Sequence, residues 1–366
     1  MKKGLCLLLA TMAVLLFALS CSSNIEPGDP FADANSGALI ATDNAGNPTT
    51  NNYDGYGYEP YQYASAMYTT PGAMAWDIGG GHLLLMMLGG KLFEYDSTNG
   101  RTEYFCKDPV CKHDNDECVA GRVSPGLEAG DGVIAVTREK GVSLPMAENY
   151  WISVLKGGRF EFVAGPILKF RYYDGFFYAI TPDWSLVRFP QEGGEPEVLL
   201  EEFYPAIMVP IKGYMYCWTY DGVGRIPLSG GEYETIIPGA MNYITDGEYL
   251  YYTREDGGVN RTDLDGNNVV TVFDDPEIWA HGICFYGEYI YYRKYIFDSE
   301  DGVGRFYGVY RVPKDRIGPV ETIYDGGEYF WLYPLTSISG KLLAFDSSKF
   351  MLFDTETGEL TKLLPG

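Results

Sequence analysis

The sequence predicts an all-β fold, and the architecture that best fits it is a β-propeller of seven four-stranded blades. Gly (45), Tyr (31) and Phe (19) are abundant in the 366 residues, which favours short strands separated by tight turns. Apolar residues at helical spacing are scarce. One phrase, a turn that ends in Gly followed by a short aromatic or aliphatic run, occurs seven times. Such repetition is typical of a fold made by stacking copies of one unit.

The repeated phrase defines the second strand of each unit. Clear copies are Asp174-Gly-Phe-Phe-Tyr-Ala-Ile, Asp246-Gly-Glu-Tyr-Leu-Tyr-Tyr and Tyr286-Gly-Glu-Tyr-Ile-Tyr-Tyr. An apolar run precedes each Gly and two more short strands follow, so the unit has four strands and a period of about 40 residues, as in a propeller blade. Because a lone four-stranded sheet exposes two apolar faces, stacking the units around an axis buries both. The Tyr rings are expected between blades, with their hydroxyls reaching water or carbonyls. The seven glycines are Gly81, Gly132, Gly175, Gly213, Gly247, Gly287 and Gly340.

The pattern Asp-Gly-x-Tyr-Leu-Tyr-Tyr followed by Arg-x-x-Leu-Asp-Gly is clearest at 241–274 and 283–325. It resembles the propeller repeats of the low-density-lipoprotein-receptor type and related bacterial domains of unknown function, over roughly residues 70–366. This resemblance also implies a propeller, while a β-sandwich or β-solenoid is the alternative. The longest intervals between glycines predict extended loops at 104–125 and 294–306.

The N-terminus has the features of a bacterial lipoprotein. Lys2 and Lys3 precede an almost wholly apolar run, Leu5 to Leu19, whose length suits a signal peptide better than a transmembrane helix. The run ends in Ala18-Leu19-Ser20-Cys21, which resembles a lipobox and implies cleavage before Cys21 and lipid on its thiol. An ordinary signal peptide with an incidental cysteine is the alternative. We therefore expect a signal peptide at 1–20 and a protein anchored by lipid to the cell membrane, facing outside the cytoplasm, on the cell surface or in the periplasm.

The remaining chain divides into a tether and a folded domain. Residues 21–68 are rich in Asn, Ser, Gly, Asp, Pro and Thr, a composition that buries too little apolar surface to fold and predicts a flexible tether. Residues 69–366 are expected to form the propeller. The chain has 50 acidic and 27 basic residues and a formal charge of −23, which argues against nucleic acid as a partner.

A cysteine and histidine cluster is the sharpest local feature. It reads Cys106-Lys-Asp-Pro-Val-Cys111-Lys-His113-Asp-Asn-Asp-Glu-Cys118 and follows the last strand of the first predicted blade. Three interpretations remain open: one structural zinc ion with a Cys₃His ligand set, a disulfide with one thiol left over, or three free thiols. A zinc ion or a disulfide would each fix the loop and act structurally. A catalytic zinc ion normally keeps an open coordination position and has fewer cysteine ligands, so a structural ion is expected here, and no cofactor is certain.

Three other patterns have simpler interpretations. Asp263-Leu-Asp265-Gly266-Asn267 has its Gly too early for an EF-hand and predicts a hairpin turn. Cys217 and Cys284 lie within apolar strands and are expected to be buried. Four arginines share one position of the repeat and are expected to bond carbonyls or acids of the next blade, with a ring that binds an anion as the alternative. They are Arg188, Arg225, Arg261 and Arg311.

The sequence favours a binding or protein-interaction module over an enzyme. No catalytic residues can be selected, because acids are numerous and no Ser/His/Asp arrangement is found. Propellers bind where loops converge on one face, and exposed Tyr and Trp side chains there suit a carbohydrate, peptide or protein ligand. The alternative is a carbohydrate-active enzyme, a glycoside hydrolase or lyase, with two acids facing each other across the central channel.

Overall fold

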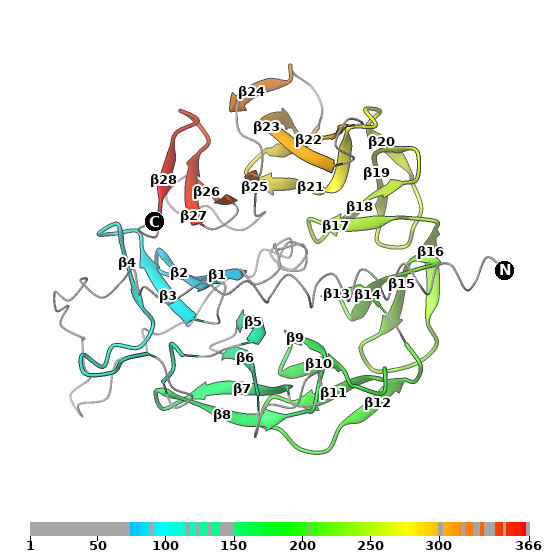
Figure 1. The fold of residues 1–366 in the computed structure, drawn as a ribbon. Helices are drawn as coiled ribbons and strands as arrows, with labels where there is room; N and C mark the ends of the chain where they lie inside the picture. The colour runs from blue at the N-terminus through cyan, green and yellow to red at the C-terminus, as the bar shows by residue number, and fades with distance from the viewer. Residues whose placement is uncertain are drawn as a thin grey trace. The chain divides into compact units, whose positions relative to one another are not determined.

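Each copy of the repeat forms one antiparallel sheet of four consecutive strands, and the seven sheets form the ring of a β-propeller (Figure 1). The predicted signal peptide, the tether and Cys21 lie outside the residues that the computed structural model describes, all of which belong to one compact unit. These described residues are 74–87, 91–113, 118–121, 124–130, 133–139, 150–203, 205–298, 303–315, 319–324, 330–332, 341–346 and 349–363.

The strands follow one another in chain order, without exchange between blades. Blade 1 contains β1 (Met74–Gly79), β2 (His82–Met87), β3 (Lys91–Asp96) and β4 (Arg101–Tyr104). Blade 2 contains β5 (Ser124–Gly130), β6 (Val133–Glu139), β7 (Tyr150–Lys156) and β8 (Arg159–Ala164). Blade 3 contains β9 (Lys169–Tyr173), β10 (Phe176–Ile180), β11 (Leu186–Pro190) and β12 (Glu197–Leu200). Blade 4 contains β13 (Ile207–Ile211), β14 (Tyr214–Thr219), β15 (Gly222–Pro227) and β16 (Glu234–Pro238).

The last three blades repeat the arrangement. Blade 5 contains β17 (Asn242–Thr245), β18 (Tyr249–Arg254), β19 (Gly257–Asp263) and β20 (Val270–Phe273). Blade 6 contains β21 (Ile278–Tyr286), β22 (Tyr289–Asp298), β23 (Val303–Pro313) and β24 (Glu321–Tyr324). Blade 7 contains β25 (Phe330–Leu332), β26 (Lys341–Asp346), β27 (Lys349–Asp354) and β28 (Leu360–Lys362). The first strand of each blade lies nearest the centre of the ring (Figure 1).

The repeated Gly sits in the hairpin between the first two strands of a blade. Asp174 and Gly175 have φ of 48° and 76°, and Lys212 and Gly213 have φ of 45° and 86°. Two successive residues in the left-handed region are the signature of a type I′ turn, whose twist matches that of the flanking strands. This backbone requirement explains why the repeat is recognisable at its Gly.

The core lies between neighbouring blades, and buried Tyr rings pack there with aliphatic side chains, as expected. Tyr216 and Tyr243 are almost completely buried between blades 4 and 5. The Tyr243 hydroxyl donates to the Tyr216 carbonyl at 2.9 Å, and the Tyr216 hydroxyl donates to the Leu264 carbonyl at 3.0 Å. Burying a large apolar side chain contributes about 1.5–3 kcal/mol, and these bonds avoid the cost of an unsatisfied hydroxyl.

One predicted loop is wrong. Residues 294–306 do not form an extended loop, because β22 and β23 continue as a long hairpin in which Lys294 pairs with Tyr307 and Asp298 with Val303. The Lys294 ammonium lies 2.7 Å from the Asp275 carboxylate, which supports the start of the extension. The alternating aromatic residues of this segment favour a strand even though the interval between repeats is long. The other predicted loop, at 104–125, is confirmed as the connection from β4 to β5.

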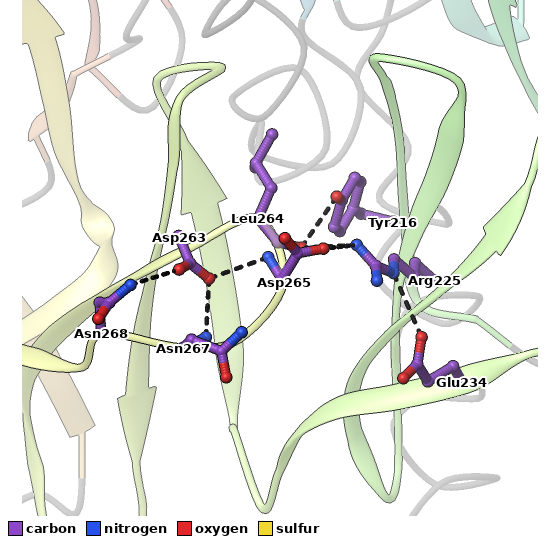
Figure 2. A network of polar contacts seen from close by, with 8 residues as sticks. All are labelled: Tyr216, Arg225, Glu234, Asp263, Leu264, Asp265, Asn267 and Asn268. Carbon is purple, nitrogen blue, oxygen red and sulfur yellow. Dashed lines mark hydrogen bonds and ion pairs between the residues drawn. The ribbon is translucent and has the colours of Figure 1, made fainter.

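The predicted contact of a repeated arginine with the next blade is clear at Arg225 (Figure 2). Its guanidinium donates to the Leu264 carbonyl at 3.2 Å and to the Asp265 carboxylate at 2.6 Å, both in the turn between β19 and β20 of blade 5. Within blade 4 it lies 3.4 Å from the Glu234 carboxylate and 4.5 Å from the centre of the Tyr214 ring. The arginine, which lies in β15, therefore joins two blades and also contacts both neighbouring strands of its own blade, β14 and β16.

Two other repeated arginines make the same kind of contact. Arg188 of blade 3 donates to the Leu228 carbonyl of blade 4 at 2.9 Å, and Arg311 of blade 6 donates to the Thr355 carbonyl of blade 7 at 3.1 Å. Arg261 packs over the Tyr249 ring at 4.4 Å. The structural role is thus confirmed for Arg188, Arg225 and Arg311, whose guanidinium groups bind the protein itself.

The segment that begins at Asp263 is a turn, as expected (Figure 2). One Asp263 carboxylate oxygen accepts the N–H groups of Asp265 (3.0 Å) and Asn267 (2.7 Å), and the other accepts the Asn268 side-chain amide (2.8 Å). Slight burial works to raise the pKa of Asp263, but these hydrogen bonds, led by that of Asn267, hold it below its ordinary value. By fixing the turn, the Asp263 carboxylate places Asp265 beside the Arg225 guanidinium.

Candidate metal centre

The chain reaches the candidate site at the end of blade 1. The connection from β4 to β5 spans 105–123, and both of its ends are tied to Leu92, a buried residue of β3. The Phe105 N–H donates to the Leu92 carbonyl at 3.0 Å, and the Leu92 N–H donates to the Ala120 carbonyl at 3.0 Å. Because one residue holds both ends, the loop returns to its starting point and brings Cys106 close to Cys118.

A turn at Asp108 returns the chain toward the same point. The Asp108 carboxylate accepts the Val110 N–H at 3.0 Å, and the Asp108 carbonyl accepts the Cys111 N–H at 3.2 Å. Asp followed by Pro109 favours such a turn, because Pro presets its own φ and the Asp side chain bonds the backbone two residues on. His113 follows with φ of 55°, and its N–H points at the Cys111 sulfur at 3.4 Å.

These features bring together all four residues that the sequence selected. One ligand atom each from Cys106, Cys111, His113 and Cys118 lies within 4.8 Å of the other three. The His113 Nδ1 lies 3.4 Å from the Cys118 sulfur. In a tetrahedral zinc site, neighbouring ligand atoms lie about 3.5–3.8 Å apart, as Zn–N and Zn–S bond lengths require. The cluster can therefore hold one metal ion after a small contraction.

The thiols are set in a partly apolar environment. Burial raises the pKa of Cys106, and it raises the pKa of Cys118 to about 12, although the Ala120 N–H donates to the Cys118 sulfur at 3.3 Å. Cys106 and Cys118 therefore favour the neutral thiol at neutral pH when no cation is bound. A bound divalent metal reverses this preference, because its charge stabilises thiolates directly.

Stacked aromatic rings orient the imidazole. The His113 ring stacks on Tyr104 with centroids 4.2 Å apart, and Tyr104 stacks on Phe93 with centroids 4.7 Å apart. The Lys91 ammonium donates to the Tyr104 hydroxyl at 3.4 Å. A ring held in this way loses less rotational freedom on binding a metal, which favours affinity.

Exposed aromatic residues on the loop face are expected from the sequence, although it does not single them out. In a four-stranded meander, the turns from the second to the third strand and the links to the next blade lie at one face, which we call the loop face. The connection from β4 to β5, which carries the four candidate ligands, belongs to it. So do Trp184 of blade 3 and Tyr220 of blade 4, which are 40% and 84% exposed. Trp184 has φ of 64°, and its N–H donates to the Thr181 carbonyl at 2.9 Å. The Asp-Trp pair between two strands is the signal that could have identified it.

The inner strands bear on the enzyme alternative. Five of the seven, namely β9, β13, β17, β21 and β25, have no Asp or Glu. The other two have Asp77 in β1 and Glu128 in β5, on neighbouring strands of adjacent blades. The alternative of two acids that face each other across the channel stays a prediction. Within the described parts of the chain, no helix has the length and apolarity to cross a membrane.

Comparison with known proteins finds similar solved structures at low sequence identity. The sequence matches no protein-family model and no curated protein. Similar solved structures include a nidogen/laminin complex (14% identity, 59% of this chain and 90% of that one, TM-score 0.39). A second is an acylaminoacyl peptidase from Pyrococcus horikoshii (15% identity, 80% of this chain and 52% of that one, TM-score 0.49). A third is a putative TolB from Agrobacterium tumefaciens (16% identity, 55% of this chain and 82% of that one, TM-score 0.37). With TM-scores below 0.5, these likenesses assign no function to this chain.

Proposed function

We propose that the protein is a lipid-anchored binding module that works outside the cytoplasm. Lipid on Cys21 holds it at the membrane, and the propeller presents its loop face to a carbohydrate, peptide or protein ligand. One zinc ion on Cys106, Cys111, His113 and Cys118 fixes the first loop of that face. The observation that carries the proposal is the convergence of all four candidate ligands on a loop whose two ends are tied to one residue.

The ligand set supports a structural zinc ion over the other interpretations. Three sulfurs and one imidazole complete a tetrahedron, leaving no open position for a substrate. A disulfide would use two of the sulfurs, yet the third sulfur and the oriented His113 ring lie at the same point. Residue types and positions therefore fit one closed metal site.

Metal analysis with thiol counting tests the zinc site on the purified mature protein. We expect about one equivalent of zinc, absent from Cys111→Ser, and five thiols after denaturation with a chelator. Cys217 and Cys284 are fully buried, so they should react only on unfolding. Three thiols and no metal would show a disulfide instead. Five thiols and no metal would show free thiols.

Exposed aromatic side chains on adjacent blades support the binding role. Trp184 and Tyr220 present large apolar areas at one face, and such side chains often anchor ligands. Glycan and peptide arrays probed with the mature protein test it. We expect a specific signal that Trp184→Ala or Tyr220→Ala reduces about tenfold or more, as for an interface anchor. Val269→Ala is the matched control, because Val269 is 56% exposed in the β19–β20 turn at the opposite face.

The same arrays can contradict the binding role. A signal that all three variants retain equally would place binding elsewhere, and cleavage of an arrayed glycan would favour the enzyme. Mass spectrometry of the N-terminal peptide tests the anchor: a diacylglyceryl group on Cys21 is expected, and an unmodified Cys21 would rule it out.

A further inference from the structure

Among the residues that the structure describes, no strand crosses the seam between blade 1 and blade 7, where the ring closes. All four strands of blade 7 come from 330–362, and all four of blade 1 come from 74–104. Side chains from both blades form one apolar cluster at the seam: Leu83, Leu85, Phe93, Tyr95, Leu343, Phe350, Leu352 and Leu363. The Thr102 hydroxyl also donates to the Leu363 carbonyl. The chain runs directly from each blade to the next in sequence, whereas the described residues of blades 1 and 7 are held together by noncovalent contacts.

The candidate metal centre is connected to this seam by stacked rings. His113, a candidate ligand, stacks on Tyr104, and Tyr104 stacks on Phe93. Phe93 is a buried member of the seam cluster, and Tyr104 packs against that cluster from β4. A continuous series of contacts therefore runs from the metal ligands through blade 1 to Leu363 and Phe350 of blade 7.

We infer that the metal centre acts as a clasp for the ring, so that metal binding stabilises closure between the first and seventh blades. This inference rests on the zinc site proposed above. A metal ion holds His113 in place, His113 holds the Tyr104 ring, and Tyr104 keeps Phe93 and β4 packed against blade 7. Since a ligand that binds only the closed form stabilises it, removal of the metal should promote opening at the seam before the rest of the ring opens.

The loop also contacts the opposite side of blade 1, which supplies an internal comparison. Phe105 packs against the cluster between blades 1 and 2, with Trp76 and Leu127 among its members. That junction is also held by the chain itself, which continues from β4 to β5. The chain makes no such direct connection between the loop and blade 7. The clasp therefore predicts that metal removal increases opening at blade 7 more than in the core of blade 2.

Hydrogen exchange on the full mature protein, with and without a zinc chelator, tests the clasp. Zinc content is measured first, so that an absence of metal counts against the zinc site and not against the clasp. We expect exchange at the Leu363 amide, which donates to the Phe350 carbonyl at 2.9 Å, to accelerate about tenfold or more after chelation. The amides of β17 and β18 in blade 5 should not change.

Two variants separate a clasp from a local staple. Tyr104→Leu removes the stacked ring, so it should retain zinc but lose the effect of chelation on Leu363. Tyr104→Phe keeps the stack and loses only the hydroxyl, so it should behave like the wild type. A zinc-loaded protein in which chelation accelerates exchange only at 105–121, or equally in all blades, would overturn the inference. So would a Tyr104→Leu protein that responds like Tyr104→Phe.

Discussion

Replacing Arg225 with Met should measure how strongly one arginine holds two blades together. Met retains much of the apolar stem of Arg225 and removes the guanidinium. The Arg225 side chain is only 14% exposed. The guanidinium binds the Leu264 carbonyl and the Asp265 and Glu234 carboxylates (Figure 2). It also packs over the Tyr214 ring, and Met can replace none of these interactions. We therefore expect the free energy of unfolding to fall.

The size of the loss follows from the environment of each partner. A hydrogen bond from a charged donor contributes about 1.5–3 kcal/mol. The Leu264 carbonyl keeps a second bond from Tyr216 at 3.0 Å, so the lower end of this range, about 1.5 kcal/mol, applies. Asp265 and Glu234 are 65% and 64% exposed, so solvent screening limits each ion pair to about 0.5 kcal/mol or less. The contact with the ring adds about 0.5–1 kcal/mol. The expected loss is therefore about 2–3 kcal/mol.

Denaturant unfolding of the mature protein, followed by Trp fluorescence at two salt concentrations, measures this loss. Arg254→Met is the control, because Arg254 is exposed and packs on Tyr252 of its own blade; its loss should be about 0.5 kcal/mol or less. A double-mutant cycle with Asp265→Asn should give a coupling of about 0.5 kcal/mol at low salt and less at high salt. If Arg225→Met matched the control and the coupling were zero at low salt, our account of the arginine's role would be refuted.

Two further predictions concern buried groups and turns. Burial raises the pKa of Cys217 and raises that of Cys284 to about 12, above the ordinary value of 9.0, so these thiols stay neutral in the folded state while they ionise in the unfolded chain. The free energy of unfolding should therefore fall as pH rises above about 9. Between about pH 9.5 and 10.5, denaturant titrations should show that the wild type loses about 1 kcal/mol more than Cys284→Ala. An equal dependence of unfolding free energy on pH in the two proteins would contradict this. Gly222→Ala should cost about 2 kcal/mol or more, because φ is 125° and the new Cβ would clash with the Ile237 carbonyl. Gly213→Ala, with φ of 86° and open space around it, should cost about 1 kcal/mol, and similar losses for the two variants would count against the clash.

The fold class was accessible from sequence because its physical requirements recur in every blade. A type I′ turn needs residues that accept positive φ, which makes Gly175 and Gly213 visible in the repeat. Alternating aromatic residues mark the strands that pack between blades. The extent of β22 and β23 was not accessible, because strand length there depends on the partner strand and on support such as that of Asp275 for Lys294.

For the candidate site, sequence alone supplied the residue types and the loop that holds them. Cysteine and histidine chemistry limited the choices to metal, disulfide or free thiols, and charge argued against nucleic acid. Only the tertiary structure showed that both ends of the loop bind Leu92 and that His113 stacks through Tyr104 onto the seam of the ring. The physical reason is that local preferences depend on neighbours in the chain, whereas convergence of ligands and closure of a ring depend on contacts between residues far apart in sequence. Leu363 and Phe93 meet only because seven blades complete one turn.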